Sequence, residues 1–218
     1  MPDDVLILPR SDSKNIQTTN SSLSIPSSCN SADVQLGCHL LASTNTLCAT
    51  VTYQTPIHLD AQVASADGRD YMLIIPLASQ TRLKNKGHMM EVSGVNGTLV
   101  FGGARYDLRS ALLPTPCEHR IKDEYLPMEM IFVHKSERCK LAVVGFVIEI
   151  GVMTSPTLSQ IFRQLAKIKN AGQVTDIAFP DFISVINSLA NYYIYRYQGS
   201  LTTPLCAEGL GWIVSNNL

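Results

Sequence analysis

The chain has 218 residues, of which 45% are hydrophobic, and a formal net charge of −1 at pH 7. This length and hydrophobic content predict one sizeable domain with a buried core, without room for a second domain. The near-neutral charge excludes a general electrostatic attraction to nucleic acid or to anionic membranes. No apolar run reaches the roughly 18 to 20 residues that span a bilayer.

The N-terminal part of the chain is rich in Ser, Thr and Asn, with the clearest low-complexity run at residues 11–33. Such a segment buries too little apolar surface to fold alone. We therefore predict an extended arm over residues 1–47, followed by a single domain over residues 48–218. The opening Met1-Pro2-Asp3-Asp4 has neither the basic nor the apolar region of a signal peptide, so we expect that an export signal has already been removed.

Cysteines and sequons together predict a secreted, extracellular glycoprotein. Two Asn-x-Ser/Thr triplets, at Asn20 and Asn96, fit an exported protein. Six cysteines without a CxxC pair favour disulfides over a zinc knuckle, and six allow fifteen connectivities, so the sequence alone leaves the pairing open. These cysteines are Cys29, Cys38, Cys48, Cys117, Cys139 and Cys206.

The first strand-like segments lie at residues 71–77 and 83–92, and Asn96-Gly97 marks a hairpin turn after them. Three basic residues alternate at the start of the second segment and just before it. We interpret them as a solvated strand face rather than as a polyanion site. They are Arg82, Lys84 and Lys86.

Residues 141–148 form a continuous apolar run that predicts a buried strand. Residues 155–171 then show apolar side chains at spacings of three and four, which predicts an amphipathic helix. Ser155 or Thr157 is the expected N-cap, and Gly172 follows the expected end. We expect the apolar face to pack on a sheet; binding of a partner is the alternative.

The central feature is the stretch of residues 108–134, which predicts two strands joined by a polar turn at residues 121–125. Along the second strand, successive side chains alternate with a period of two, which places them on opposite faces of a sheet. One set is Leu126, Met128, Met130, Phe132 and His134, and the other is Pro127, Glu129, Ile131 and Val133.

Three segments of the chain resemble the alpha-carbonic anhydrases, especially those of plants, bacteria and fungi. The first is T-P-C-E-H at residues 115–119 followed by E-M-I-F-V-H at residues 129–134, in the frame of the family's T-P-S-E-H and E-x-H-x-V-H. The second is Q-T-P-I-H-L at residues 54–59. The third, residues 195–214, follows the family's Y-x-G-S-L-T-T-P-P-C-x-E-x-V-x-W-I-V. The resemblance ends near residue 214, whereas family members normally continue further.

The fold that this resemblance implies is predominantly β, with peripheral helices around a large, mostly antiparallel, twisted central sheet. The three histidines that hold zinc in the family fall on Leu112, Pro114 and Ile131. Catalytic zinc needs three protein donors and an open position for water, and these side chains offer no lone pair. The comparison therefore predicts that all three zinc ligands are lost, that no cofactor is bound, and that the chain is not an enzyme.

Other family positions retain their residues. His88 matches the histidine that shuttles protons, Thr202 the threonine that orients the zinc hydroxide, and Glu118 the glutamate that holds this threonine. We interpret His88 as an inherited or structural histidine, because without a metal hydroxide it has no evident proton to carry. Thr202 and Glu118 either brace the fold through a buried hydrogen bond or line a pocket with a new ligand.

The resemblance also suggests disulfides. In exported members a cysteine before the Q-S-P motif pairs with one in a late loop, which implies a Cys48–Cys206 bridge here. Cys117 and Cys139 flank the central hairpin and make a plausible second pair. That choice leaves Cys29 with Cys38.

Our leading hypothesis is a secreted, non-catalytic protein that acts by binding a protein, a glycan or a small apolar ligand, including a surface, host-interaction or effector role. The resemblance implies that Val143, Leu201 and Trp212 surround the lost ligand positions, as a plugged core or as a small apolar pocket. The main alternative is carbon dioxide hydration with a relocated metal. Ester hydrolysis without a metal is a remote third possibility, since no G-x-S-x-G motif occurs. The sequence leaves the partner and the oligomeric state open.

Overall fold

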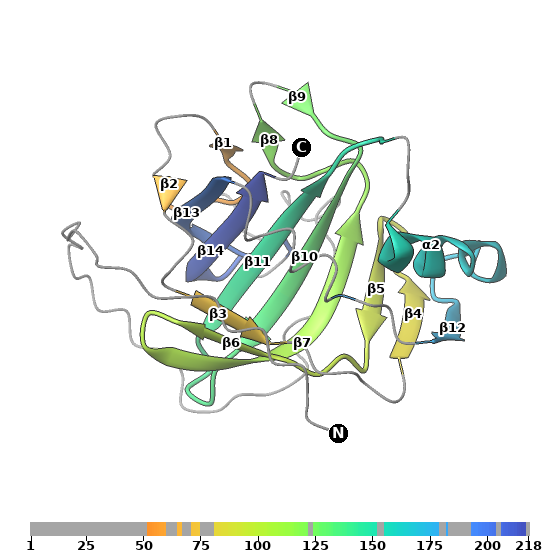
Figure 1. The fold of residues 1–218 in the computed structure, drawn as a ribbon, viewed down its shortest axis with the longest axis horizontal. Helices are drawn as coiled ribbons and strands as arrows, with labels where there is room; N and C mark the ends of the chain where they lie inside the picture. The colour runs from red at the N-terminus through yellow and green to blue at the C-terminus, as the bar shows by residue number, and fades with distance from the viewer. Residues whose placement is uncertain are drawn as a thin grey trace.

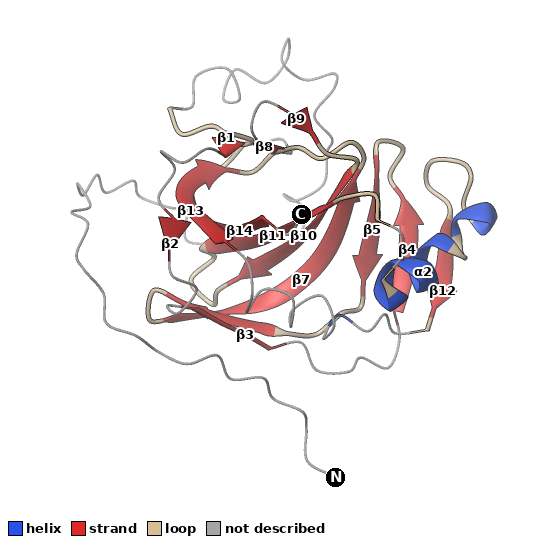
Figure 2. Ribbon diagram, turned by 45° about the horizontal axis from the view of Figure 1, so that its top comes forward, coloured by secondary structure: helices blue, strands red, loops and turns tan. Residues whose placement is uncertain are grey.

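A computed structural model describes residues 52–59, 65–66, 71–74, 81–121, 124–151, 155–178, 182, 193–203 and 206–216. Figure 1 shows these residues arranged around one large twisted sheet, and Figure 2 shows the same sheet curving around its inner face. The predicted arm at residues 1–47 lies outside the described residues, as do Asn20, Cys29, Cys38 and Cys48. No helix in the described part of the chain is long and apolar enough to cross a membrane.

The large sheet has 11 strands. Its neighbouring strands are antiparallel in each described pair except β11 with β14, which is parallel. The predicted fold class, mostly β around a large and mostly antiparallel twisted sheet, is therefore confirmed. The main path is β12 (Val174–Ile177), β4 (Thr81–Asn85), β5 (Met89–Ser93), β7 (Ala104–Pro114), β10 (Met128–Lys135), β11 (Leu141–Ile148), β14 (Glu208–Asn216), β13 (Tyr193–Ser200) and β2 (Ser65–Ala66).

Two smaller groups of strands complete the β structure. β6 (Thr98–Phe101) pairs with β7 and with β3 (Tyr71–Ile74). A separate sheet contains β1 (His58–Leu59), β8 (Arg120–Ile121) and β9 (Glu124–Tyr125). β8 and β9 occupy the place of the polar turn expected in the central hairpin, because the connection between β7 and β10 forms its own short pairing.

The alternation predicted for residues 126–134 holds along β10, where it divides the core into two layers. Met130 and Phe132 belong to one buried cluster, and Ile131 and Val133 belong to a second cluster on the opposite face of β10. Leu126, which precedes the strand, belongs to the second cluster and not to the side predicted for it. A register shift between Val133 and His134 interrupts the pairing of β10 with β7. Both faces of this strand are therefore covered, in agreement with its nearly continuous apolar sequence.

The helical segment covers the first cluster but is shorter than predicted. α2 (Pro156–Phe162) begins at Ser155, whose hydroxyl accepts a hydrogen bond from the Leu158 N–H at 3.2 Å, and this confirms the predicted cap. After Phe162 the chain continues as the 3₁₀ helix η1 (Leu165–Lys167). Figure 1 shows α2 beside β4 and β12 at one end of the sheet.

Hydrogen bonds to β4 explain why the expected helix at residues 155–171 ends early. The Asn85 side chain donates to the Ile168 carbonyl at 2.8 Å, and the Asn85 carbonyl accepts from the Gly172 N–H at 2.7 Å. These bonds compete with a continued helical ladder, and Ile168 reaches the buried cluster from a non-helical conformation.

Residues 83–92, predicted as one strand-like segment, are two strands joined by a tight turn. β4 ends at Asn85, whose side-chain oxygen accepts from the Gly87 N–H at 2.7 Å. Gly87 has a φ of +96°, which glycine adopts without steric cost. The turn brings Lys86 and His88 to the rim of the inner face of the sheet.

Candidate functional site

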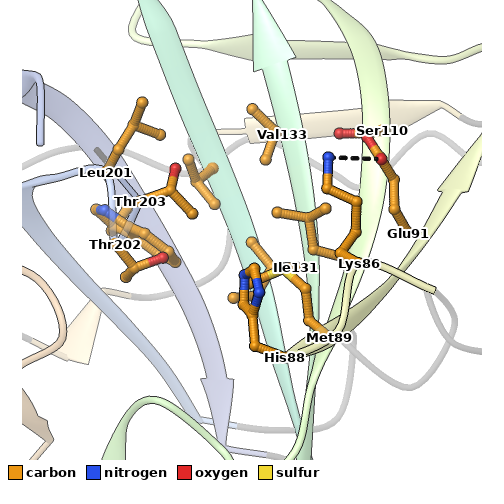
Figure 3. A pocket seen from close by; sticks show the side chains of 13 residues that line it. Lys86, His88, Met89, Glu91, Ser110, Ile131, Val133, Leu201, Thr202 and Thr203 are labelled. Atoms are coloured by element: carbon orange, nitrogen blue, oxygen red, sulfur yellow. Dashed lines mark ion pairs between the residues drawn. The ribbon is translucent and has the colours of Figure 1, made fainter. Parts of the chain in front are cut away.

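A pocket opens on the face of the sheet that carries the second cluster. The space in it that the centre of a water molecule can reach is about 50 Å³, and the pocket opens to solvent. Figure 3 shows residues from the β4–β5 turn on one side, residues that follow β13 on the other, and Ile131 between them. The lining consists of Lys86, His88, Met89, Glu91, Ser110, Leu112, Ile131, Val133, Val143, Leu201, Thr202, Thr203 and Trp212.

The floor of the pocket is apolar and is held by strand pairing. Leu112 of β7 lies directly opposite Ile131 of β10. Val143 of β11 lies opposite Trp212 of β14 across the parallel pair. Ile131, Val143 and Trp212 are almost fully buried, whereas Leu112 is partly exposed to the cavity. The resemblance placed Val143, Leu201 and Trp212 around this site, and all three line the pocket.

The three positions that correspond to zinc ligands do not fit a zinc ion. Leu112 and Ile131 line the pocket, but Pro114 is buried at the end of β7 opposite Met89 and is not part of the lining. None of these side chains has a lone pair to donate, and zinc in proteins is held by nitrogen, sulfur and carboxylate oxygen. Among the described residues, no cluster of three or more His, Cys, Asp or Glu side chains is arranged to hold a metal.

The wall formed by the β4–β5 hairpin carries an ion pair. Lys86 Nζ lies 3.3 Å from Glu91 Oε2, and the two side chains are 20% and 18% exposed. Figure 3 shows both charged groups directed toward the cavity near Ser110. His88 lies at the mouth and is exposed to solvent.

The prediction of one solvated basic face on residues 82–86 therefore needs correction. Arg82 is exposed, with its Nε 3.5 Å from Asp176 on the neighbouring strand β12, as a solvated face would require. Lys86, in contrast, lines the pocket. The register places Lys84 opposite Glu91, so the face that carries the three basic residues is the face of the pocket, and Lys86, next to the end of β4, is the one of the three that reaches the lining.

The opposite wall carries hydroxyl groups on the loop after β13. The Leu201 N–H donates to the Ala207 carbonyl and the Cys206 N–H to the Thr203 carbonyl, each at 2.9 Å, so this loop is tightly turned. Trp212 Nε1 donates to the Ser200 carbonyl at 3.0 Å and ties the loop to the floor. Thr202 and Thr203 are thereby held at the edge of the pocket.

Glu118 lies behind Thr202, and the hydrogen bond expected between them is present. Burial raises the pKa of Glu118 to about 7, the Thr202 hydrogen bond opposes this rise, and the nearby Glu129 charge adds to it. Oε2 of Glu118 is buried without a hydrogen-bond partner in the described part of the chain. Thr202 thus lines the pocket while Glu118 supports it from behind.

A buried polar network that the sequence pattern does not predict lies beneath this site. His119 Nδ1 is 2.7 Å from Glu129 Oε1, and His119 Nε2 is 2.6 Å from the Tyr197 hydroxyl, which is 3.3 Å from Thr55 Oγ1. Glu129 Oε2 also accepts from the backbone N–H groups of Glu118 and His119. His119 and Glu129 are fully buried. The network joins β10, β13 and the segment before β1, so it braces the fold.

The cysteines differ in part from the predicted pairing. Cys117 is a buried free thiol, 3.4 Å from Glu129 Oε2, and burial raises its pKa. The predicted Cys117–Cys139 bridge is therefore wrong: Cys117 belongs to the polar network, and Cys139 takes part in another disulfide. Cys206 is also disulfide-bonded. The pairings Cys48–Cys206 and Cys29–Cys38 involve residues outside the described part and stay predictions.

Several proteins similar to this chain are named carbonic anhydrases. The chain is 31% identical over 181 residues to alpha carbonic anhydrase 8 of Arabidopsis thaliana, covering 79% of this chain and 45% of that protein. It is 32% identical over 170 residues to a carbonic anhydrase of Neisseria gonorrhoeae, covering 77% of this chain and 65% of that protein. The alpha-carbonic anhydrase structure from Aspergillus oryzae matches with a TM-score of 0.72 and 32% identity, covering 76% of this chain and 71% of that chain. This chain thus spans about half to two thirds of these relatives.

These names correct two predictions, namely that the chain is not an enzyme and that zinc is not expected. Proteins from Neisseria and Pectobacterium, and structures from Photobacterium profundum and Thermovibrio ammonificans, are named carbonic anhydrases. The family therefore points to an enzyme and to zinc as its cofactor. A metal bound by this chain would use donors other than Leu112, Pro114 and Ile131.

The sequence pattern described as eukaryotic-type carbonic anhydrase matches residues 42–218. This range contains the whole sheet, the pocket and the buried network, and it exceeds half of the chain. The chain belongs to the eukaryotic-type carbonic anhydrase family.

Proposed function

We propose that this member of the family uses its pocket to bind a small molecule with an apolar body. The observation that carries the proposal is the apolar floor, where Leu112 is partly exposed to the cavity beside its nearly buried cross-strand partner Ile131. Apolar ligand surface placed on this floor leaves water, and that transfer is favourable in proportion to its area. The few polar side chains at the rim orient the ligand, as in most small-molecule sites.

Relatives of the same fold support a ligand of this size. The Thermovibrio ammonificans carbonic anhydrase structure is described as a complex with sulfanilamide. The dioscorin structure, which is 26% identical to this chain, is described as a complex with ascorbate. Both ligands are molecules with a single ring.

A fragment titration tests the proposal. Burial of a single ring contributes only a few kcal/mol to the binding free energy, and the loss of the fragment's motion opposes it. We therefore expect a Kd of about 1 mM for toluene. Ligand-observed NMR titration measures affinities in this range. Failure of toluene and other single-ring fragments to bind the folded protein would contradict the proposal.

A matched pair of variants locates the binding. Leu112→Asn places an amide on the floor, and we expect toluene affinity to fall about fivefold to tenfold. Leu165→Asn is the control, since Leu165 is also partly buried but packs against the cluster on the other face of the sheet. It should leave the affinity unchanged, and thermal unfolding of both variants verifies that they fold.

A carbon dioxide hydration assay with zinc supplied, on the same preparation, tests the family's reaction separately from ligand binding. Activity in that assay would place a metal on donors other than Leu112, Pro114 and Ile131. Metal analysis of the active fraction together with variants of His88 and Glu91, which line the pocket, would then identify those donors.

A further inference from the structure

The two polar walls of the pocket differ in kind. One wall carries opposite charges, on Lys86 and Glu91, and the other carries the hydroxyls of Thr202 and Thr203. Figure 3 shows these groups on opposite sides of the apolar floor. A ligand that lies on the floor with one end toward β5 therefore meets the ion pair.

The ion pair keeps hydrogen-bonding capacity toward the cavity. An ammonium has three donors and a carboxylate about four acceptor sites, so the contact of 3.3 Å between Lys86 Nζ and Glu91 Oε2 uses only part of each. Each side chain is about four-fifths buried. The remaining donors of Lys86 and acceptors of Glu91 are available to a group that enters from the floor.

The charges of this wall sum to zero, and this decides which ligand groups fit. A ligand carboxylate beside Lys86 also lies within a few ångströms of Glu91, and a ligand cation beside Glu91 lies equally close to Lys86, so attraction and repulsion largely cancel. Either ion must also leave water at the edge of an apolar floor, which is costly. A neutral group with a donor and an acceptor side by side meets both partners and loses much less hydration.

We propose that the pocket selects small neutral ligands that carry a primary carboxamide on an apolar ring, in preference to carboxylates and amidinium cations of the same shape. The carboxamide oxygen accepts from Lys86 and its NH₂ donates to Glu91, while the ring lies over Leu112 and Ile131. This inference deepens the proposed function and rests on it. Lys86 and Glu91 are then the residues that determine specificity.

Three isosteric probes and toluene test this selectivity by NMR titration at pH 7.5. Benzamide, benzoate and benzamidine share one ring and differ in the charge of one planar group. For the unmodified protein we expect benzamide to bind about tenfold more tightly than either ion, a difference expected when two buried hydrogen bonds replace an opposed charge. Toluene reports the contribution of the floor alone.

Charge-removing variants should invert the order. Glu91→Gln leaves Lys86 as the unopposed charge, so benzoate should become the tightest of the three probes. Lys86→Gln leaves Glu91 unopposed, so benzamidine should become the tightest. Arg82→Gln removes a charge from the same hairpin, but Arg82 is exposed and pairs with Asp176 outside the pocket, so the order should stay that of the unmodified protein.

The outcomes separate the two proposals. If toluene and benzamide both fail to bind the folded protein, the proposed function is wrong. If toluene binds but benzamide binds no better than benzoate, or if Glu91→Gln and Lys86→Gln fail to invert the order, the carboxamide assignment is overturned while ligand binding stands. Thermal unfolding of each variant verifies that a loss of binding does not reflect a loss of fold.

Discussion

Glu129 accepts hydrogen bonds from the backbone of both Glu118 and His119 while its other oxygen pairs with the His119 ring at 2.7 Å. One carboxylate therefore fixes the loop that carries Glu118 behind the pocket. Both partners are fully buried, so neither can exchange its contact for water.

Replacing Glu129 should be among the most destabilising changes in the molecule. Glu129→Ala leaves the His119 ring and two backbone N–H groups without their acceptor, and we expect a loss of about 3 to 5 kcal/mol in the free energy of unfolding. Urea denaturation measures the loss. The comparison is Glu91→Gln, which keeps an amide oxygen as acceptor for Lys86 at the edge of the pocket and should cost only about 1 to 2 kcal/mol. Equal effects of the two changes would contradict this account.

Tyr197→Phe tests the outer end of the same network. The Tyr197 hydroxyl lies between His119 Nε2 at 2.6 Å and Thr55 Oγ1 at 3.3 Å. Its removal should cost about 1 to 2 kcal/mol in urea denaturation. Tyr195→Phe, on the same strand β13, removes a hydroxyl outside this network and should cost less than about 0.5 kcal/mol. A larger cost for Tyr195→Phe than for Tyr197→Phe would contradict the assignment.

Glu118 should make the protein less stable as the pH rises. Its pKa is raised from 4.5 to about 7 in the folded state, mainly by burial, so between these values the unfolded chain releases its proton while the folded protein keeps it. Ionisation in the fold then costs up to about 3 kcal/mol above pH 7. Glu118→Gln removes this dependence, and urea denaturation at pH 4.5 and 8 should show a gain in stability that is confined to the higher pH. A uniform change at both pH values would contradict the prediction.

His134 should make the protein more stable as the pH rises, over nearly the same pH range. Burial lowers the pKa of His134 from 6.5 to about 4. The stability that the neutral side chain contributes is therefore complete above pH 6.5 and is lost as the pH falls toward 4. Because the effects of Glu118 and His134 on stability oppose each other, the free energy of unfolding of the unmodified protein should change little between pH 4.5 and 6.5. His134→Asn should expose the Glu118 term as a fall in stability with rising pH, measured by the same denaturation series. Persistence of the flat profile in both single variants would contradict the paired assignment.

Asn96 tests the prediction that its sequon carries a glycan. It is exposed in the turn between β5 and β6, so an attached glycan would not enter the core. Expressed with an export signal in a eukaryotic host, the protein should lose one glycan in Asn96→Gln, seen as a mass change that glycosidase treatment of the parent reproduces. Asn96→Asp would serve as a second variant. An unchanged mass would show that this sequon is not used.

The alternation along β10 was predicted correctly from the sequence, whereas the helical pattern of residues 155–171 was confirmed only over its first part. The alternation along residues 126–134 separated Ile131 from Phe132 as the structure does, because strand geometry leaves only two faces. The family motifs added the pairing of Leu112 with Ile131 in one site and the contact of Glu118 with Thr202.

The failures involve bonds between segments far apart in sequence. The Asn85 side chain donates a hydrogen bond to the Ile168 carbonyl, and this ends the helix that the local sequence of residues 155–171 favoured. Cys117 is directed toward Glu129 rather than toward Cys139, a choice that depends on which side of the loop faces the core. Lys86 lies on the face of the sheet that also carries Glu91, and strand alternation alone could not show that this face is hollowed into a pocket.

The parallel pairing of β11 with β14 also affects the order in which the molecule can assemble. Val143 and Trp212 are neighbours across this pair but lie far apart along the chain, so their contact closes a long loop. Such non-local contacts form slowly. On a ribosome, the hairpin of β10 and β11 would emerge well before Trp212 and would expose Val143 and Ile131. The pocket would therefore be the last part of the sheet to form, and a nascent chain held at this stage would expose apolar surface that chaperones bind.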